Sequence, residues 1–169
     1  MKRKTKSLLV LAGLFPVFWG WTPEGRGFPS AGAARIAGCP DSPNCVSSRD
    51  PPGRRWIAPL GLRGSPEEAF RCLKEILLQG PRTTLVVEEG GYLHAESRTA
   101  LGFVDDVEFE FDPESRSILL RSASRTGYWD LGVNRRRLEA LRAAFESKCR
   151  QGGNSRSARD RTSLPGNGR

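Results

Sequence analysis

The residues best suited to chemistry lie in two short stretches of the chain, 39–48 and 122–137. The first, CPDSPNCVSS, combines cysteines, prolines and serines within ten residues. The second, SASRTGYWDLGVNRRR, is dense in arginine, serine and aromatic residues at the point where a helix is expected to begin. Neither composition is needed for an ordinary hydrophobic core, so both stretches are candidates for a functional site.

Three consecutive arginines fall in the first turn of that expected helix: Arg135, Arg136 and Arg137. The helix dipole disfavours cations there, so a negative group should compensate them. Nearby carboxylates can do this, namely Asp105, Asp106, Glu108 or Asp130. The result would be a salt-bridge network that clamps helix to sheet. A bound anion held by helix N–H groups and arginines is the alternative, and the sequence leaves both open.

Asp105 stands out because of its place in a predicted strand over 102–111. Val107, Phe109 and Phe111 alternate with acidic residues, so they should point to the core, and Asp105 shares their parity. A carboxylate on the core side is costly unless it is paired or hydrogen-bonded. Its candidate partners are Arg125, Arg135, Arg136 and Arg137, with hydrogen bonds from Ser122 and Ser124.

A turn at 112–115 would pair this strand with a following one over 117–123. A four-residue turn sets the opposed pairs as Phe109–Ile118, Val107–Leu120, Asp105–Ser122 and Asp106–Arg121. Apolar rows then meet on one face, and opposite charges meet on the other, which favours this register.

Evidence for catalysis in the sequence is thin. His94 is the only histidine, and no nucleophile-elbow glycine pattern surrounds any serine. Asp106 and Glu108 lie on one strand face and resemble a glycosidase pair, but alternating acids on a solvated strand are commoner. No phosphate-cradling glycine loop or histidine-based metal cluster is present. We therefore expect no cofactor and no metal.

The elements that position these residues follow the order helix, four strands, helix. Ser65, Pro66 and Glu68 form a helix start, and Gly80-Pro81 ends that helix. Strands are predicted over 83–87, 92–97, 102–111 and 117–123, and the last helix over 134–148. The fold class is α+β: a four-stranded antiparallel meander with two helices packed on one face. An extended, disulfide-containing segment precedes it.

Residues 1–33 are predicted to be a signal peptide or an N-terminal anchor. Four basic residues among the first six precede the uncharged run 7–21, and Ala31-Gly32-Ala33 resembles a cleavage site. An uncleaved anchor and a lipobox over 36–39 are the alternatives. We expect the protein to be exported, either periplasmic or membrane-anchored and facing the extracytoplasmic side.

Four cysteines in an exported chain predict disulfides. Cys39 and Cys45 are close enough in sequence to close a small loop. Cys72 falls in the first predicted helix and Cys149 at the end of the last one, and the two can pair if these helices are antiparallel. A zinc site is disfavoured, because the spacing between Cys39 and Cys45 is wider than in usual zinc motifs. Cys72 and Cys149 also have no other cysteine nearby in the sequence.

The net charge of +8 is concentrated at the two ends of the chain. Residues 1–6 carry four positive charges, and 150–169 carry five arginines and one aspartate. Residues 7–149 are neutral, with 18 charges of each sign. The predicted domain over 39–149 is therefore not expected to bind nucleic acid, and 150–169 is predicted to be a disordered basic tail.

Five pieces of the sequence carry a family resemblance: CPDSPNCVSS, WIAPL, SPEEAF, GFVDDVEFEFD and RSASRTGYWDLGVNRRRLEALRAAF. In this order, over about residues 39–147, they resemble the domain of unknown function family 1499 (DUF1499). The resemblance implies a small domain, often exported, lipid-anchored or fused to membrane segments, with no established reaction. It places the following residues on motif positions: Cys39, Pro40, Pro43, Asn44, Cys45, Asp105, Asp106, Glu108, Arg121, Ser122, Ser124, Arg125, Gly127, Asp130, Gly132, Asn134, Arg135 and Arg137. Trp129 stands where a small polar residue is more familiar.

These observations together predict a non-enzymatic envelope domain with a charged cleft at the junction of sheet and helix. Its partner would be an unknown envelope protein or a small anionic ligand, and its N-terminus would associate it with a membrane. The alternative is a hydrolase that uses a carboxylate of 105–108 with Arg121 or Arg125.

Overall fold

The computed structural model of the chain describes residues 35–160, with side chains as far as Cys149. The predicted signal or anchor over 1–33 lies outside the described residues, as does the end of the predicted tail, 161–169. Eight elements follow one another along the chain: β1 Cys45–Ser47, β2 Leu60–Gly61, α1 Pro66–Leu78, β3 Thr83–Glu89, β4 Tyr92–Arg98, β5 Val104–Asp112, β6 Ser117–Ser124 and α2 Val133–Asp160.

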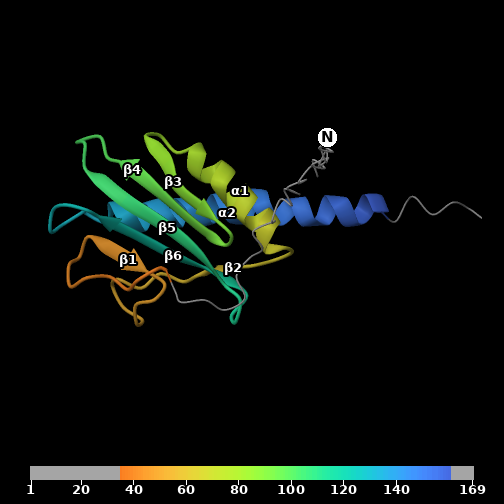
Figure 1. Cartoon of the computed structure of the whole chain (residues 1–169), viewed down its shortest axis with the longest axis horizontal. Coiled ribbons are helices and arrows are strands. Elements are labelled where there is room, and N and C mark those ends of the chain that lie inside the picture. Colours follow the sequence, from red (N-terminus) through yellow and green to blue (C-terminus); the bar gives the residue numbers. More distant parts are fainter. Residues whose placement is uncertain (1–34, 161–169) are drawn as a thin grey trace, which may run out of the picture.

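A single antiparallel sheet forms the centre of the fold, with strand order β1-β6-β5-β4-β3. The four long strands form the predicted meander, and α1 and α2 cover one of its faces (Figure 1). The α+β class is thus confirmed. The sheet has six strands rather than four, because the segment predicted to be extended adds β1 and β2, both paired with β6.

Helix α1 begins and ends where local chemistry predicts. The Ser65 side chain accepts a hydrogen bond from the Glu68 backbone N–H at 3.2 Å, and Pro66 occupies the first turn. The buried face recurs at helical spacing through Phe70, Leu73 and Leu77. The cap at Gln79 closes the helix just before Gly80.

The core lies between the helices and the inner face of the sheet. Val107 and Phe109 of β5 and Leu120 of β6 are almost fully buried, together with Leu73 of α1 and Leu138 of α2. Each such side chain contributes about 1.5–3 kcal/mol through removal from water. This inner face is also the face on which Asp105 lies.

Helix α2 continues to Asp160, twelve residues beyond its predicted end at Lys148. Its 28 residues correspond to about 42 Å at the usual helical rise of about 1.5 Å per residue. Within residues 35–160, no helix is both long and apolar enough to cross a membrane.

Both predicted disulfides are present. Cys39 and Cys45 are joined with their Cα atoms 5.6 Å apart, and Cys72 and Cys149 with theirs 6.0 Å apart. The second bond fixes α1 to α2. No free cysteine occurs among the described residues.

The predicted register of the β5–β6 hairpin is wrong by two residues. Asp112 and Ser117 pair with each other and close a loop over 113–116, so Phe109 lies opposite Leu120, and Asp105 opposite Ser124. Asp112 is a paired strand residue, and its carboxylate accepts hydrogen bonds from the Glu114 backbone and the Ser115 hydroxyl. The even shift keeps every side chain on its predicted face, but Arg121 now opposes Glu108 instead of Asp106.

Candidate functional site

Asp105 lies on the core side of β5 and pairs with Arg137. The aspartate is 1% exposed, and its Oδ2 atom accepts a hydrogen bond from Arg137 Nη2 at 2.6 Å. Arg137 can reach inward because it lies near the start of α2, which packs against β6. Of the four predicted partner arginines, Arg125 and Arg135 bind elsewhere, and Arg136 folds back on the Leu131 carbonyl.

Asn134 is the centre of this buried junction. It is fully buried, and its Oδ1 atom accepts hydrogen bonds from Ser122 and from Arg137. Its Nδ2 atom donates to the Asn44 carbonyl and the Ser124 hydroxyl at 2.9 and 3.0 Å. One side chain therefore ties the first turn of α2 to β6 and to the disulfide-containing segment.

Asp130 holds the N-terminal end of α2. Its carboxylate accepts hydrogen bonds from the Gly132 and Asn134 backbone N–H groups, both at 2.9 Å. Partial burial works to raise the pKa of Asp130, but these hydrogen bonds outweigh it and hold the pKa below its ordinary value. A negative charge at this point offsets the unfavourable position of the three arginines.

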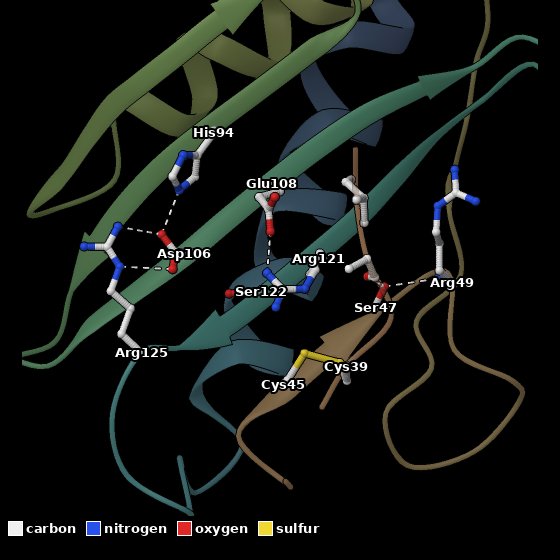
Figure 2. A network of polar contacts seen from close by, with 12 residues as sticks. Cys39, Cys45, Ser47, Arg49, His94, Asp106, Glu108, Arg121, Ser122 and Arg125 are labelled. Atoms are coloured by element: carbon white, nitrogen blue, oxygen red, sulfur yellow. Dashed lines mark hydrogen bonds and ion pairs between the residues drawn. A yellow bond between two sulfur atoms is a disulfide. The ribbon is translucent and has the colours of Figure 1, made fainter. Parts of the chain in front are cut away.

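The outer face of the sheet carries a second, separate polar network (Figure 2). Asp106 receives two hydrogen bonds from Arg125, at 2.8 and 3.0 Å, and contacts His94 Nε2 at 2.7 Å. Arg125 also reaches Glu96 at 2.7 Å. Partial burial works to raise the pKa of Asp106, but Arg125 and His94 outweigh it and hold the pKa below its ordinary value.

Glu108 occupies the next outward position of β5. It forms an ion pair with Arg121, its cross-strand neighbour, and accepts a hydrogen bond from the Tyr92 hydroxyl at 2.8 Å. Burial, followed by this hydrogen bond to a carboxylate, raises the pKa of Tyr92 well above its usual range. Asp106 and Glu108 are two of the carboxylates in the hydrolase alternative over 105–108, and they pair with Arg125 and Arg121, the arginines of that alternative. The lowered pKa favours the ionised form of Asp106.

Glu110 holds the segment 35–37 against the outer face of the sheet. Its two carboxylate oxygens accept hydrogen bonds from the backbone N–H groups of Arg35 and Ile36, at 2.8 and 3.0 Å. Ile36 is 1% exposed, so it shields this part of the sheet. The Ser47 hydroxyl donates to the Ala37 carbonyl at 2.9 Å and secures the same segment.

An open groove of about 910 Å³ lies beside the buried junction. One wall is the disulfide-containing segment with Pro43, Arg54 and Trp56, and the other is the loop between β6 and α2 with Tyr128 and Trp129. Asp130 and Arg135 are the predicted site residues that line it.

Arg135 is positioned in this groove by the backbone. Its Nη2 atom donates to the carbonyl oxygens of Arg54 and Trp56, at 2.8 and 2.7 Å. No carboxylate of the described residues forms a salt bridge with Arg135 or with Arg54. The acids of the groove are already occupied, because Arg55 pairs with Asp41 and Asp50 and Asp130 caps α2.

Apart from Arg135, which lies in the groove, the predicted site residues fall into two groups on opposite faces of the sheet. Asp105, Ser122, Ser124, Asp130, Asn134 and Arg137 meet at the buried junction, whereas Asp106, Glu108, Arg121 and Arg125 lie on the outer face. Arg54 and Trp56 were not predicted as site residues, and Tyr128 and Trp129 were indicated only as part of the stretch 122–137, not individually. Two adjacent aromatic residues in a loop rich in glycine were the signal that could have indicated them.

No group of three or more histidine, cysteine or acidic residues within 35–149 is arranged to hold a metal ion.

Acid is expected to destabilise the protein through Asp106 and Asp130. A carboxylate whose pKa is lowered by folding stabilises the native state above its unfolded pKa, and this contribution is lost as the pH falls through the folded pKa. We expect the free energy of unfolding to decline below about pH 4, where an unfolded aspartate titrates. Urea denaturation between pH 7 and pH 2.5 measures this.

Asp130→Asn isolates part of this pH dependence, since asparagine still accepts hydrogen bonds at a helix start. Its stability should fall less steeply with acid than that of the parent. Glu114→Gln, at an exposed carboxylate in the β5–β6 turn, is the control and should follow the parent curve. Equal acid slopes for Asp130→Asn and the parent would contradict this assignment.

Fold and site define the class of protein: a small α+β domain braced by two disulfides, with a buried polar junction beside an open groove. The chain belongs to the family described as "Protein of unknown function (DUF1499)", which matches residues 35–145 and confirms the resemblance. No curated protein and no solved structure matches the chain.

Proposed function

We propose that the protein is an exported binding module, and that its groove takes an anionic group carried on an apolar or ring-shaped ligand or partner segment. The observation that carries this proposal is the placement of Arg135. Its guanidinium is held by two backbone carbonyls rather than by a carboxylate, so its position is fixed while its charge is not neutralised within the described residues. Such a group is suited to bind a carboxylate or phosphate.

Aromatic side chains complement that charge. Tyr128 and Trp129 are 65% and 62% exposed, and Trp56 is half-buried in the opposite wall. Aromatic faces provide contact area at low entropic cost, and convergent polar groups beside them fix the orientation of a ligand. Export is supported by the two disulfides, which persist in oxidising compartments, and by the predicted signal at 1–33.

Arg135→Gln is expected to weaken anion binding in the groove. Phenyl phosphate combines a ring with an anionic group, and its binding can be titrated by tryptophan fluorescence. Loss of the charged hydrogen bonds should reduce its affinity about tenfold or more. Phenol, which lacks the anionic group, should not show saturable binding.

Arg142→Gln is the matched control. Arg142 lies two helical turns after Arg135 on α2 and also donates to backbone carbonyls, those of Ala58 and Pro59. It pairs with Glu139 at 3.1 Å and does not line the groove. Arg142→Gln should therefore bind phenyl phosphate as the parent does. No saturable binding to the parent, or equal losses in both variants, would contradict the proposal.

A further inference from the structure

Large apolar side chains are exposed mainly in two loops of the described structure. Of seven such residues within 35–149, five lie between β4 and β5 or between β6 and α2: Leu101, Phe103, Tyr128, Trp129 and Leu131. Leu101 and Leu131 are 84% and 79% exposed. Single exposed apolar residues need no explanation, but a cluster of them marks an interaction surface.

The two loops lie side by side at one end of the sheet, at the left of Figure 1. β4 ends and β5 begins there, β6 ends beside them, and the Arg125 N–H donates to the Val104 carbonyl at 3.0 Å. Hydrogen bonds between Thr99 and Phe103 close the first loop. We call this end, defined by 99–103 and 126–132, the loop end.

Leu131 is held in a conformation that its own side chain disfavours. Its φ angle is 52°, in the left-handed region where glycine or asparagine is favoured and a branched residue is strained. The side chain gains no burial in return, since it is 79% exposed. Arg82 and Arg116 share this left-handed backbone, but Leu131 alone of the three is apolar, and an external contact would give its exposed side chain the burial that the fold does not.

Arginines surround the loop end. Arg54, Arg82, Arg135 and Arg136 form no salt bridge with a carboxylate of the described residues. Arg82 lies at the start of β3, where its carbonyl accepts the Arg98 N–H. The loop end therefore combines projecting leucine and aromatic side chains with a positive rim.

We propose that the loop end is a membrane-contact surface that inserts these apolar side chains into the interface of an anionic phospholipid bilayer. Tryptophan and tyrosine favour the headgroup level of a bilayer, and arginines are attracted to anionic lipids. Leu101, Phe103 and Leu131 lie outside the groove and project from two separate loops, an arrangement that suits a deformable lipid surface better than a folded protein partner.

The test measures the depth of Trp129 in a bilayer with the full chain. Trp19, Trp21 and Trp56 are replaced by phenylalanine, which leaves Trp129 as the only tryptophan. The protein is mixed with vesicles of phosphatidylcholine and phosphatidylglycerol at 3:1, with and without brominated acyl chains. We expect brominated lipid to quench Trp129. A tryptophan placed by Glu114→Trp in the β5–β6 turn, with Trp129→Phe, lies at the opposite end and should remain unquenched.

Leu131→Gly then separates membrane contact from stability. It relieves the strained φ angle, so the variant should fold at least as stably as the parent, yet its Trp129 quenching should require about tenfold more lipid. Leu101→Ser should act in the same direction, whereas Val86→Ser, at an exposed apolar residue of β3, should have no effect. Neither leucine lines the groove, so phenyl phosphate binding should persist in both variants. Absence of quenching, with or without vesicle binding, or quenching insensitive to Leu131→Gly and Leu101→Ser, overturns the proposal.

Discussion

Asp105→Ala is expected to destabilise the protein by roughly 3–5 kcal/mol. The substitution leaves the Arg137 guanidinium at the buried junction without its carboxylate, and an uncompensated charge is costly to keep away from water. Two details place the loss at the lower end of that range. In the native protein, the buried Oδ1 atom of Asp105 has no hydrogen-bond partner in the described structure. The alanine substitution removes this unsatisfied atom, and the cost of keeping it away from water is removed with it. Arg137 itself is 16% exposed and can regain some water.

Asp106→Ala is the matched control for this measurement. Asp106 is the next residue on β5, and its partner Arg125 is 43% exposed, so removal of this outer pair should cost about 1 kcal/mol or less. Urea denaturation of both variants compares the two faces of one strand. The double variant Asp105→Leu/Arg137→Met should recover most of the lost stability, because both charges are then absent. Equal stability of Asp105→Ala and the parent would show that the junction is not structural.

Loss of the Cys72–Cys149 disulfide is expected to be the other large effect. The bond closes a loop with a sequence separation of 77 residues, and the chain-entropy relation gives roughly 4–5 kcal/mol for a loop of this length. The double variant Cys72→Ser/Cys149→Ser should lose about that amount, because the unfolded chain regains its freedom. Thermal and urea denaturation under non-reducing conditions measure it.

Cys39→Ser/Cys45→Ser provides the comparison within the same chain. Its loop has a separation of only 6 residues, for which the same relation gives about 2 kcal/mol. The ratio of the two losses tests the entropic account directly. A larger loss from the short loop would show that this disulfide acts mainly on the native state, through the segment it holds against β6.

Much of the fold could be predicted because local signals agreed with one another. The start of α1 at Ser65, the alternation in β5 and the spacing of apolar residues in α2 each indicated the correct element. The strands β1 and β2 could not be predicted, since segments of three and two residues carry no periodic signal and form only where β6 offers a partner.

The register of the β5–β6 hairpin could not be predicted from the pattern of apolar residues. Phe109 suits either Ile118 or Leu120 as its opposite residue, so hydrophobicity alone did not distinguish two registers that differ by an even shift. The observed register is the one in which the Asp112 carboxylate accepts hydrogen bonds from Glu114 and Ser115 within the turn.

The candidate site was only partly accessible from sequence for a related reason. Asp105 could be placed on the inner face by parity, but the choice of Arg137 over Arg125 depends on how α2 lies across the sheet. The groove depends on two loops separated by some 70 residues in the chain, and no spacing within either loop indicates that they face each other.

The positions of the four cysteines also determine the order in which the two disulfides can form as the chain emerges from its N-terminus. Cys45 follows Cys39 almost at once, so the short loop can close first. If export is coupled to synthesis, Cys72 must then wait until Cys149 has been made, and at about 5–20 residues per second this interval is roughly 4–15 s. Throughout it the chain carries one unpaired thiol in α1, and the covalent frame is complete only once the part of α2 that packs on the sheet has been made.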